Sequence, residues 1–268
     1  MSASLPIRLV EKPWGKDILP APFTRPDKVR TGEIWFEPPE ELPGLLVKYI
    51  FTSEKLSVQV HPSDTQTQRA GLGRQGKEEC WLVIDTEPGA TLGIGFREPL
   101  SSEAMRAAAL DGSIEGLLEW HSVKPGDFFY IPANTVHAIG AGVSLIEVQQ
   151  NSDITYRLYD YGRPRELHLD DAIAVAQGAP YPPSLAKSVA PAAAMTLVEG
   201  PLFRFDQLSG PHGAETALRY RGPLLAIPRS GMVRIDGAQL APGQCGLARS
   251  IDEIDIPSGS TCLIAQPI

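Results

Sequence analysis

Residues 57–64, Ser57-Val58-Gln59-Val60-His61-Pro62-Ser63-Asp64, alternate polar and apolar side chains and then reach a proline. This alternation predicts a β-strand in which Ser57, Gln59 and His61 share one face. Pro62 ends the strand, because proline cannot donate to the hydrogen-bond ladder of a sheet, so His61 is expected at the rim. An amide oxygen and an imidazole nitrogen on one surface predict half of a metal site.

The composition is typical of a globular protein and argues against several other classes. The chain has 268 residues, of which 43% are hydrophobic and 21% are charged, enough for one large domain or two modest ones. The formal net charge of -8 argues against nucleic acid or an anionic membrane as the main partner. No segment has the apolar length of a signal peptide or membrane span, and three cysteines are too few for a disulfide framework. We therefore expect a cytoplasmic protein.

Short apolar runs separated by glycines and prolines predict many brief β-strands. The segment 101–120 differs, because it is rich in Ala and Leu and begins with two serines that can cap a helix. From residue 177 to 194 the composition shifts to Gly, Ala, Pro and Ser, which predicts a linker. The expected organisation is a catalytic domain over residues 1–180, with a helical insertion at about 101–120, and a smaller β-rich domain over 195–268.

Two of the five histidines stand in contexts that suit a metal ligand. His61 shares a face with Gln59, and the acidic pair Glu78-Glu79 follows it along the chain. His137 comes after a Gly-Asp turn, a strand and a Pro-Ala-Asn turn, an order that resembles the second half-motif of the cupin barrels. Two histidines, a carboxylate and an amide oxygen suit a borderline divalent ion such as zinc, with room left for water or a substrate oxygen.

A series of sequence blocks between residues 12 and 160 resembles the short-form class I mannose-6-phosphate isomerases, which are cupins. The blocks are KPWG at 12–15, GEIW at 32–35, SVQVHP at 57–62, GKEECW at 76–81, IPANTVHAI at 131–139 and NSDITYRLYD at 151–160. The resemblance implies a mainly β fold: a cupin-type (jelly-roll) β-barrel with a small helical insertion, and a second, smaller C-terminal β-barrel half without metal.

The resemblance also implies one zinc ion per chain, held by Gln59, His61, Glu79 and His137. Strand alternation alone leaves the choice between Glu78 and Glu79 open, because both faces of that strand are partly apolar. The Lys-x-Glu pattern of the family selects Glu79.

The same resemblance makes Arg157 a catalytic residue and puts Lys77 in the site, two residues before Glu79 and on the same face. Asp153 lies four residues before Arg157 on the same expected strand face, and Ser57, Lys77 and Arg157 are the expected substrate-binding residues. Lys77 is a candidate proton carrier if burial near the zinc and Arg157 lowers its pKa. The base stays open between Lys77, Asp153 and a zinc-bound water.

The substrate phosphate needs local cations, because the protein as a whole is negative. The candidates are Lys77, Arg157, Arg163 and Lys48. For Lys48 and Arg163 a solvated surface position is the simpler interpretation.

The implied activity is the reversible isomerisation of mannose 6-phosphate and fructose 6-phosphate. A proton moves between neighbouring carbons through an enediol(ate), and Arg157 can stabilise the charge that develops on oxygen. Two alternatives stay open: a metal-dependent cupin dioxygenase, and a non-catalytic cupin that binds sugar phosphates. The expected partner is a small sugar phosphate rather than nucleic acid or a membrane, and the expected assembly is a monomer or a small homo-oligomer.

Overall fold

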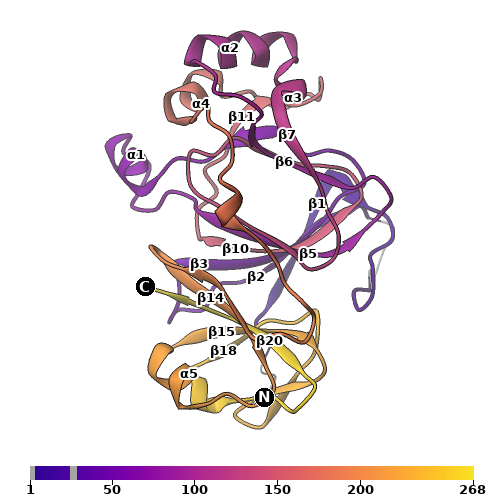
Figure 1. Ribbon diagram of the computed structural model, residues 1–268, viewed down its shortest axis with the longest axis vertical. Helices are drawn as coiled ribbons and strands as arrows, with labels where there is room; N and C mark the ends of the chain where they lie inside the picture. The colour runs from indigo at the N-terminus through magenta and orange to yellow at the C-terminus, as the bar shows by residue number, and fades with distance from the viewer. Residues whose placement is uncertain (1–3, 25–28) are drawn as a thin grey trace.

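The computed structural model describes residues 4–24 and 29–268, which form two β-rich halves joined at a seam (Figure 1). In the first half, a seven-stranded antiparallel sheet faces a five-stranded antiparallel sheet. In spatial order, the larger sheet contains β1 (Ile7–Lys16), β2 (Thr31–Phe36), β3 (Leu45–Phe51), β10 (Val143–Gln150), β5 (Glu79–Thr86), β8 (Asp127–Ile131) and β12 (Ala186–Ser188). The smaller sheet contains β11 (Tyr156–Tyr159), β4 (Val58–Val60), β9 (His137–Ile139), β6 (Thr91–Phe96) and β7 (Leu118–Ser122).

Strand β10 lies between two hydrophobic cores, one on each face of the larger sheet. All eight of its residues are buried, because both of its faces are covered. Ile146 and Val148 pack into the seam with the second half, whereas Leu145 packs among apolar side chains inside the first half. The alternation of a β-strand then directs Glu147 toward the interior of the first half, where the site lies.

Three helices cover the smaller sheet at the end of the molecule opposite the second half (Figure 1). They are α2 (Ser102–Asp111), α3 (Ile114–Leu117) and α4 (Leu169–Val175). Ser101 caps α2, and Gly112 ends it with a φ of 81°, a left-handed conformation that suits glycine. The segment expected to be helical, 101–120, therefore holds two helices, and its last three residues already belong to β7.

Helix α1 (Asp64–Arg69) follows strand β4 closely along the chain. Ser63 caps it, because its hydroxyl accepts from the backbone of Gln66 while the Gln66 side chain accepts from the backbone of Ser63. The helix that begins at this capping box turns the chain away from the strand just after His61, so His61 lies at the rim of the sheet.

The second half contains a five-stranded and a three-stranded sheet. The first contains β13 (Met195–Glu199), β14 (Phe203–Ser209), β20 (Thr261–Pro267), β15 (Leu224–Ser230) and β18 (Gly246–Ala248), and the second contains β17 (Ala238–Leu240), β16 (Val233–Ile235) and β19 (Ile254–Asp255). Helix α5 (Ala214–Arg219) and two 3-10 turns, η1 (Pro183–Leu185) and η2 (Ile251–Glu253), complete the chain.

The segment 177–194 is more ordered than the expected linker. Its strand β12 pairs with β8 and so extends the larger sheet of the first half. We therefore propose that the boundary between the two domains falls after β12 rather than at residue 180.

One hydrophobic core crosses the seam. It takes Tyr49, Phe128 and Ile146 from the larger sheet, and Phe205 and Leu263 from the second half. The rings of Phe128 and Phe205 lie 6.2 Å apart between centroids. The second half thus covers the outer face of the sheet whose inner face carries the candidate site.

Replacing Phe205 with alanine is expected to lower the free energy of unfolding by about 3–5 kcal/mol, because the lost ring leaves a cavity in this shared core. Leu218 on α5 is 67% exposed, so Leu218→Ala is a matched control expected to change stability by less than about 0.5 kcal/mol. Urea denaturation of the full chain measures both variants. Equal effects of the two substitutions would contradict a shared core.

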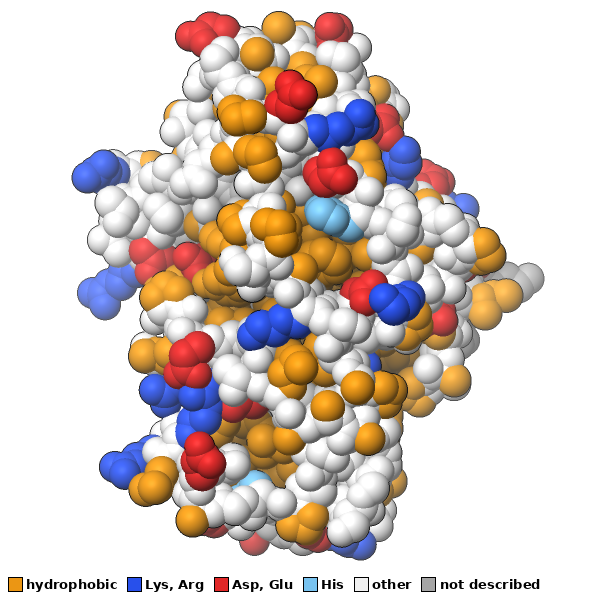
Figure 2. Space-filling view, in the orientation of Figure 1, with side chains coloured by type: hydrophobic (Ala, Val, Ile, Leu, Met, Phe, Trp, Pro, Cys, Tyr) orange, Lys and Arg blue, Asp and Glu red, His pale blue; other side chains and the backbone are white. Residues whose placement is uncertain are grey.

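The surface shows no single dominant charge on the face drawn in Figure 2, where acidic and basic side chains are interspersed. Among the described residues, no helix is long and apolar enough to cross a membrane. The three cysteines, Cys80, Cys245 and Cys262, are free and buried.

Candidate active site

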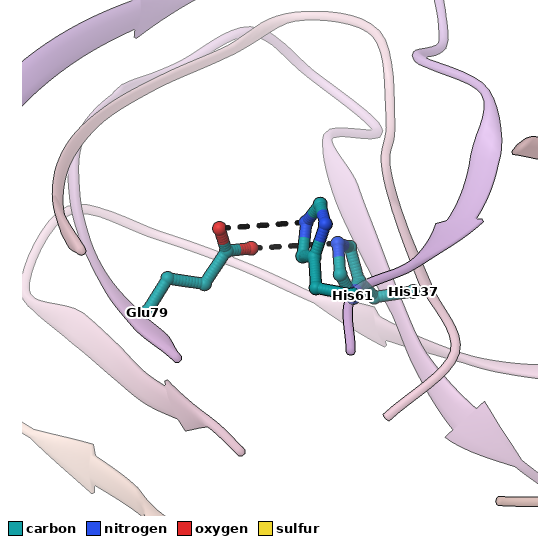
Figure 3. Close-up of side chains that lie close together, drawn as sticks. All are labelled: His61, Glu79 and His137. Carbon is teal, nitrogen blue, oxygen red and sulfur yellow. Dashed lines mark ion pairs between the residues drawn. The ribbon is translucent and has the colours of Figure 1, made fainter. Parts of the chain in front are cut away.

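Three buried side chains from separate strands converge inside the first half. His61 follows β4, Glu79 begins β5 and His137 begins β9, and each is at most 2% exposed. Nε2 of His61 lies 3.6 Å from Oε2 of Glu79, and Nε2 of His137 lies 3.4 Å from Oε1 of Glu79. Figure 3 shows both imidazoles turned toward this carboxylate. One ligand atom from each residue falls within 4.8 Å of the others, a geometry that suits a metal ion.

The other nitrogen of each histidine is occupied by a backbone carbonyl. Nδ1 of His61 lies 2.8 Å from the carbonyl oxygen of Ile154, and Nδ1 of His137 lies 2.9 Å from that of Thr135. A neutral imidazole that donates through Nδ1 keeps a lone pair on Nε2, the atom that points to Glu79. Burial lowers the pKa of His61 well below its usual value and that of His137 to about 4. Both rings are therefore neutral near pH 7, as metal ligands must be.

Gln59 lies directly beside this cluster. It pairs with His137 across β4 and β9, and its Nε2 lies 3.3 Å from Nε2 of His137. The hydroxyl of Ser57 donates to Oε1 of Gln59 over 3.0 Å. A half-turn of the amide would exchange its two ends, so the Gln59 oxygen can also face the cluster.

Lys77 touches the cluster as well. Its Nζ lies 2.9 Å from Oε2 of Glu79 and 3.1 Å from Nε2 of His61. Burial alone lowers the pKa of Lys77, but Glu79 and Glu147 outweigh it and hold the pKa above its usual value. The two carboxylates therefore oppose the lowered pKa on which a role of Lys77 as proton carrier was conditional, and they favour its ammonium form.

The donor set fits a divalent metal ion. Burial and the nearby Glu147 raise the pKa of Glu79 to about 7, although the charge of Lys77 opposes this shift. Among the described residues, its Oε1 accepts no hydrogen bond although it is fully buried. A cation would satisfy this carboxylate, which has one buried oxygen without a partner and a neutral imidazole nitrogen near each of its oxygens.

A cavity of about 270 Å³ opens beside the cluster. Five of the residues expected in the site line it: Ser57, Gln59, Lys77, Asp153 and Arg157. The backbone of Arg157 pairs with that of Gln59 across β11 and β4, which places the arginine next to the candidate metal ligands. Asp153 precedes β11 and is exposed.

Arg157 is available to bind a ligand in this cavity. It is half-buried, and its Nε is buried without a hydrogen-bond partner in the described part of the chain. Burial, followed by the positive charge of Arg165, lowers the pKa of Arg157. Two guanidinium groups close together in one cavity predict an anion between them.

Known proteins resemble this chain both in sequence and in fold. No family model matches the chain. Over 137 residues the chain is 45% identical to the mannose-6-phosphate isomerase ManA of Bacillus subtilis, and 44% identical to the mannose-6-phosphate isomerase of Streptococcus mutans. Each match covers 49% of this chain and 43% of the relative, so it spans less than half the length of these relatives.

The solved structures extend the likeness to nearly the whole chain. The mannose 6-phosphate isomerase of Bacillus subtilis superimposes with a TM-score of 0.77 over 98% of both chains, at 24% identity. A variant of phosphomannose isomerase from Salmonella typhimurium gives a TM-score of 0.74 over 98% of both chains, at 15% identity. The chain has the fold of the mannose-6-phosphate isomerases. The predicted resemblance and the predicted mainly β, cupin-type fold class are confirmed.

Sequence reasoning missed Arg165, which lines the cavity of this isomerase fold. Asp160 holds it, because Nε and Nη2 of Arg165 each donate to a different oxygen of that buried carboxylate over 2.6 Å. Arg163, a candidate from the sequence, pairs with Asp160 and Glu54 instead and is absent from the cavity wall. The sequence signal for an ordered loop was Asp160, which ends the TYRLYD block shortly before Arg163 and Arg165.

Sequence reasoning also missed Glu147 and misplaced Lys48. Lys48 is 5% exposed rather than at the surface, and its Nζ lies 3.2 Å from Oε1 of Glu147 and donates to Gln149 over 2.5 Å. Nε1 of Trp81 donates to the other oxygen of Glu147 over 3.0 Å. Each charged residue interrupts a fully buried strand, β3 or β10, and that interruption is the signal that could have revealed the pair.

Replacing Lys48 with methionine is expected to lower the free energy of unfolding by about 3–5 kcal/mol, because the Glu147 charge would stay buried without its partner. Arg8→Met is the matched control, since Arg8 stacks on the same Trp35 ring and pairs with a glutamate, but at the surface. Its expected effect is below about 1 kcal/mol. The double variant Lys48→Met, Glu147→Gln should regain stability in urea denaturation. A double variant less stable than Lys48→Met would contradict this account.

Proposed function

We propose that the chain is a zinc-dependent mannose-6-phosphate isomerase that interconverts D-mannose 6-phosphate and D-fructose 6-phosphate. The observation that carries the proposal is the convergence of His61, Glu79 and His137 beside a polar cavity lined by Lys77 and Arg157. Relatives named mannose-6-phosphate isomerase at up to 45% identity over about half of the chain support it.

In this proposal, Gln59, His61, Glu79 and His137 hold one zinc ion per chain. The ion would supply a positive charge that polarises a sugar oxygen, a contribution of several kcal/mol in metal-assisted reactions. With the Gln59 amide turned so that its oxygen faces the cluster, the Ser57 hydroxyl can accept from the amide nitrogen instead of donating to the oxygen. The two backbone carbonyls fix the rings of His61 and His137.

The reaction moves a proton between two neighbouring carbons, so the cavity needs a group that accepts a proton and a group that gives one. Lys77 carries a proton on Nζ beside the cluster and is positioned to donate to a sugar oxygen. Asp153, on the cavity wall, offers a carboxylate that can take a proton from carbon. Well-placed acid and base groups typically contribute about 10²–10⁴-fold to the rate.

Arg157 and Arg165 are proposed to hold the charged end of the substrate. Guanidinium groups bind phosphate oxygens with paired hydrogen bonds, and the two charges otherwise repel one another. Asp160 offsets part of this repulsion and keeps Arg165 at the cavity. Arg165 takes the place of Arg163 among the proposed phosphate ligands, whereas Lys48 also lines the cavity but is already paired with Glu147 and Gln149.

The wider setting is also part of the proposal. Three free, buried cysteines support a reducing compartment such as the cytoplasm. A monomer or a small homo-oligomer is expected.

The test is an assay of the purified chain with mannose 6-phosphate in the presence of zinc, coupled to detection of fructose 6-phosphate. We expect turnover, with kcat/KM for mannose 6-phosphate at least about 100-fold above that for mannose, because mannose leaves the Arg157 guanidinium without an anionic partner. A parallel oxygen electrode should record no oxygen consumption, which a dioxygenase would require. Folded, zinc-loaded protein that binds the sugar phosphate without turnover would instead favour the non-catalytic cupin.

A further inference from the structure

A second cavity lies in the seam, away from the candidate active site. It measures about 190 Å³. Its walls come from the loop after β1, from β3, β5 and β10 of the larger sheet, and from β15 and the loop before β18. Most of this wall is apolar, including Pro22, Phe23, Ile84, Ile146, Pro228 and Pro242.

Arg229 is the cationic residue of this wall. It is half-buried on β15, and its two terminal nitrogens donate to the carbonyl oxygen of Val189 and to Oε1 of Gln207. Among the described residues no carboxylate pairs with it, and burial lowers its pKa. These two acceptors hold the guanidinium rigidly and leave some of its five N–H donors free.

Asp85 is the anionic residue of the same wall. It lies near the end of β5, is partly buried, and has neither an ion pair nor a side-chain hydrogen bond within the described ranges. The two opposite charges therefore share one apolar cavity without forming an ion pair with each other. Partly buried charges without an oppositely charged partner are costly, and a bridging molecule with both charges would supply that partner to each of them.

We propose that this seam cavity binds a small zwitterion of the amino acid class, with its carboxylate on Arg229 and its ammonium group on Asp85. The cavity size suits a molecule of a few carbons, and the mostly apolar wall suits a short methylene chain. Because the walls come from both halves, bound ligand would hold the halves together and raise the unfolding temperature.

The test is calorimetric titration of the full chain with glycine, β-alanine and 4-aminobutyrate, with acetate and methylammonium as probes that carry a single charge. At least one amino acid is expected to bind, with at least about tenfold higher affinity than either single-charge probe. Arg229→Gln and Asp85→Asn should each weaken binding at least about tenfold, and Arg229→Lys should retain part of it. Arg234→Gln is the control, since Arg234 pairs with Asp255 on the exposed surface.

Repeating the titration in a His137→Ala background excludes binding of the amino acid through a metal ion. The affinity should be unchanged there, because the seam cavity lies on the outer side of the larger sheet. Circular dichroism and a comparison of each variant's unfolding temperature with that of the parent identify any variant that fails to fold. The proposal is overturned if no amino acid binds, if acetate binds as tightly, or if a folded Arg229→Gln variant binds as the parent does.

Discussion

Replacing His137 with alanine is expected to remove the bound metal ion and the isomerase activity together. The variant loses one of two neutral imidazoles that face Glu79, and the buried carboxylate keeps too few partners to hold an ion. Since the ion is expected to supply several kcal/mol and each 1.36 kcal/mol is a factor of ten, the rate should fall by about 10²–10⁴-fold or more. Elemental analysis and the coupled assay on the same sample measure both effects.

His121→Ala is the matched control for this variant. His121 is a partly buried histidine on β7, in contact with Phe129 and Tyr181 rather than with Glu79. It should keep its metal and most of its activity. A folded His137→Ala protein with full metal content would show that the ion binds elsewhere.

Arg157→Ala is expected to lower kcat/KM by about 10²–10³-fold while leaving the metal content and the unfolding temperature nearly unchanged. The side chain has a buried Nε without a protein partner, so its removal costs little in the free protein. Its donors are used only when an anionic substrate or a developing negative charge is present. Steady-state kinetics with mannose 6-phosphate give the size of the effect.

Arg163→Ala separates this role from a general loss of positive charge. Arg163 belongs to the same region of the chain but pairs with Asp160 and Glu54 outside the cavity, so its loss should change kcat/KM less than about threefold. Arg157→Lys should recover part of the activity. If Arg163→Ala and Arg157→Ala had equal effects, the charge would act at long range and Arg157 would have no specific place in the reaction.

The sequence was sufficient where local pattern decides the structure. The alternation from Ser57 to His61 predicted strand β4 and the shared face of Gln59 and His61. The Gly-Asp turn and Pro-Ala-Asn turn placed His137 at the start of a strand, as the structure shows. The choice of Glu79 over Glu78 needed the resemblance, because alternation fixes relative faces but leaves open which face turns inward.

Other features depended on partners that are distant in sequence or on the net result of opposing charges. Lys48 is buried because Glu147, on the neighbouring strand, compensates it, and nothing around Lys48 in the sequence reveals this. Arg165 reaches the cavity because Asp160 turns it inward. The pKa of Lys77 depends on whether burial or the nearby carboxylates dominate, and that balance is set only in the folded protein.

The most direct test follows metal content and isomerase rate in one purified sample, first untreated, then after chelation, and then after zinc is added back. The proposed function predicts about one metal ion per chain at the start, loss of the ion and of turnover together, and recovery of both with zinc. Chelated protein that contains no metal and still isomerises mannose 6-phosphate at its original rate would contradict the account.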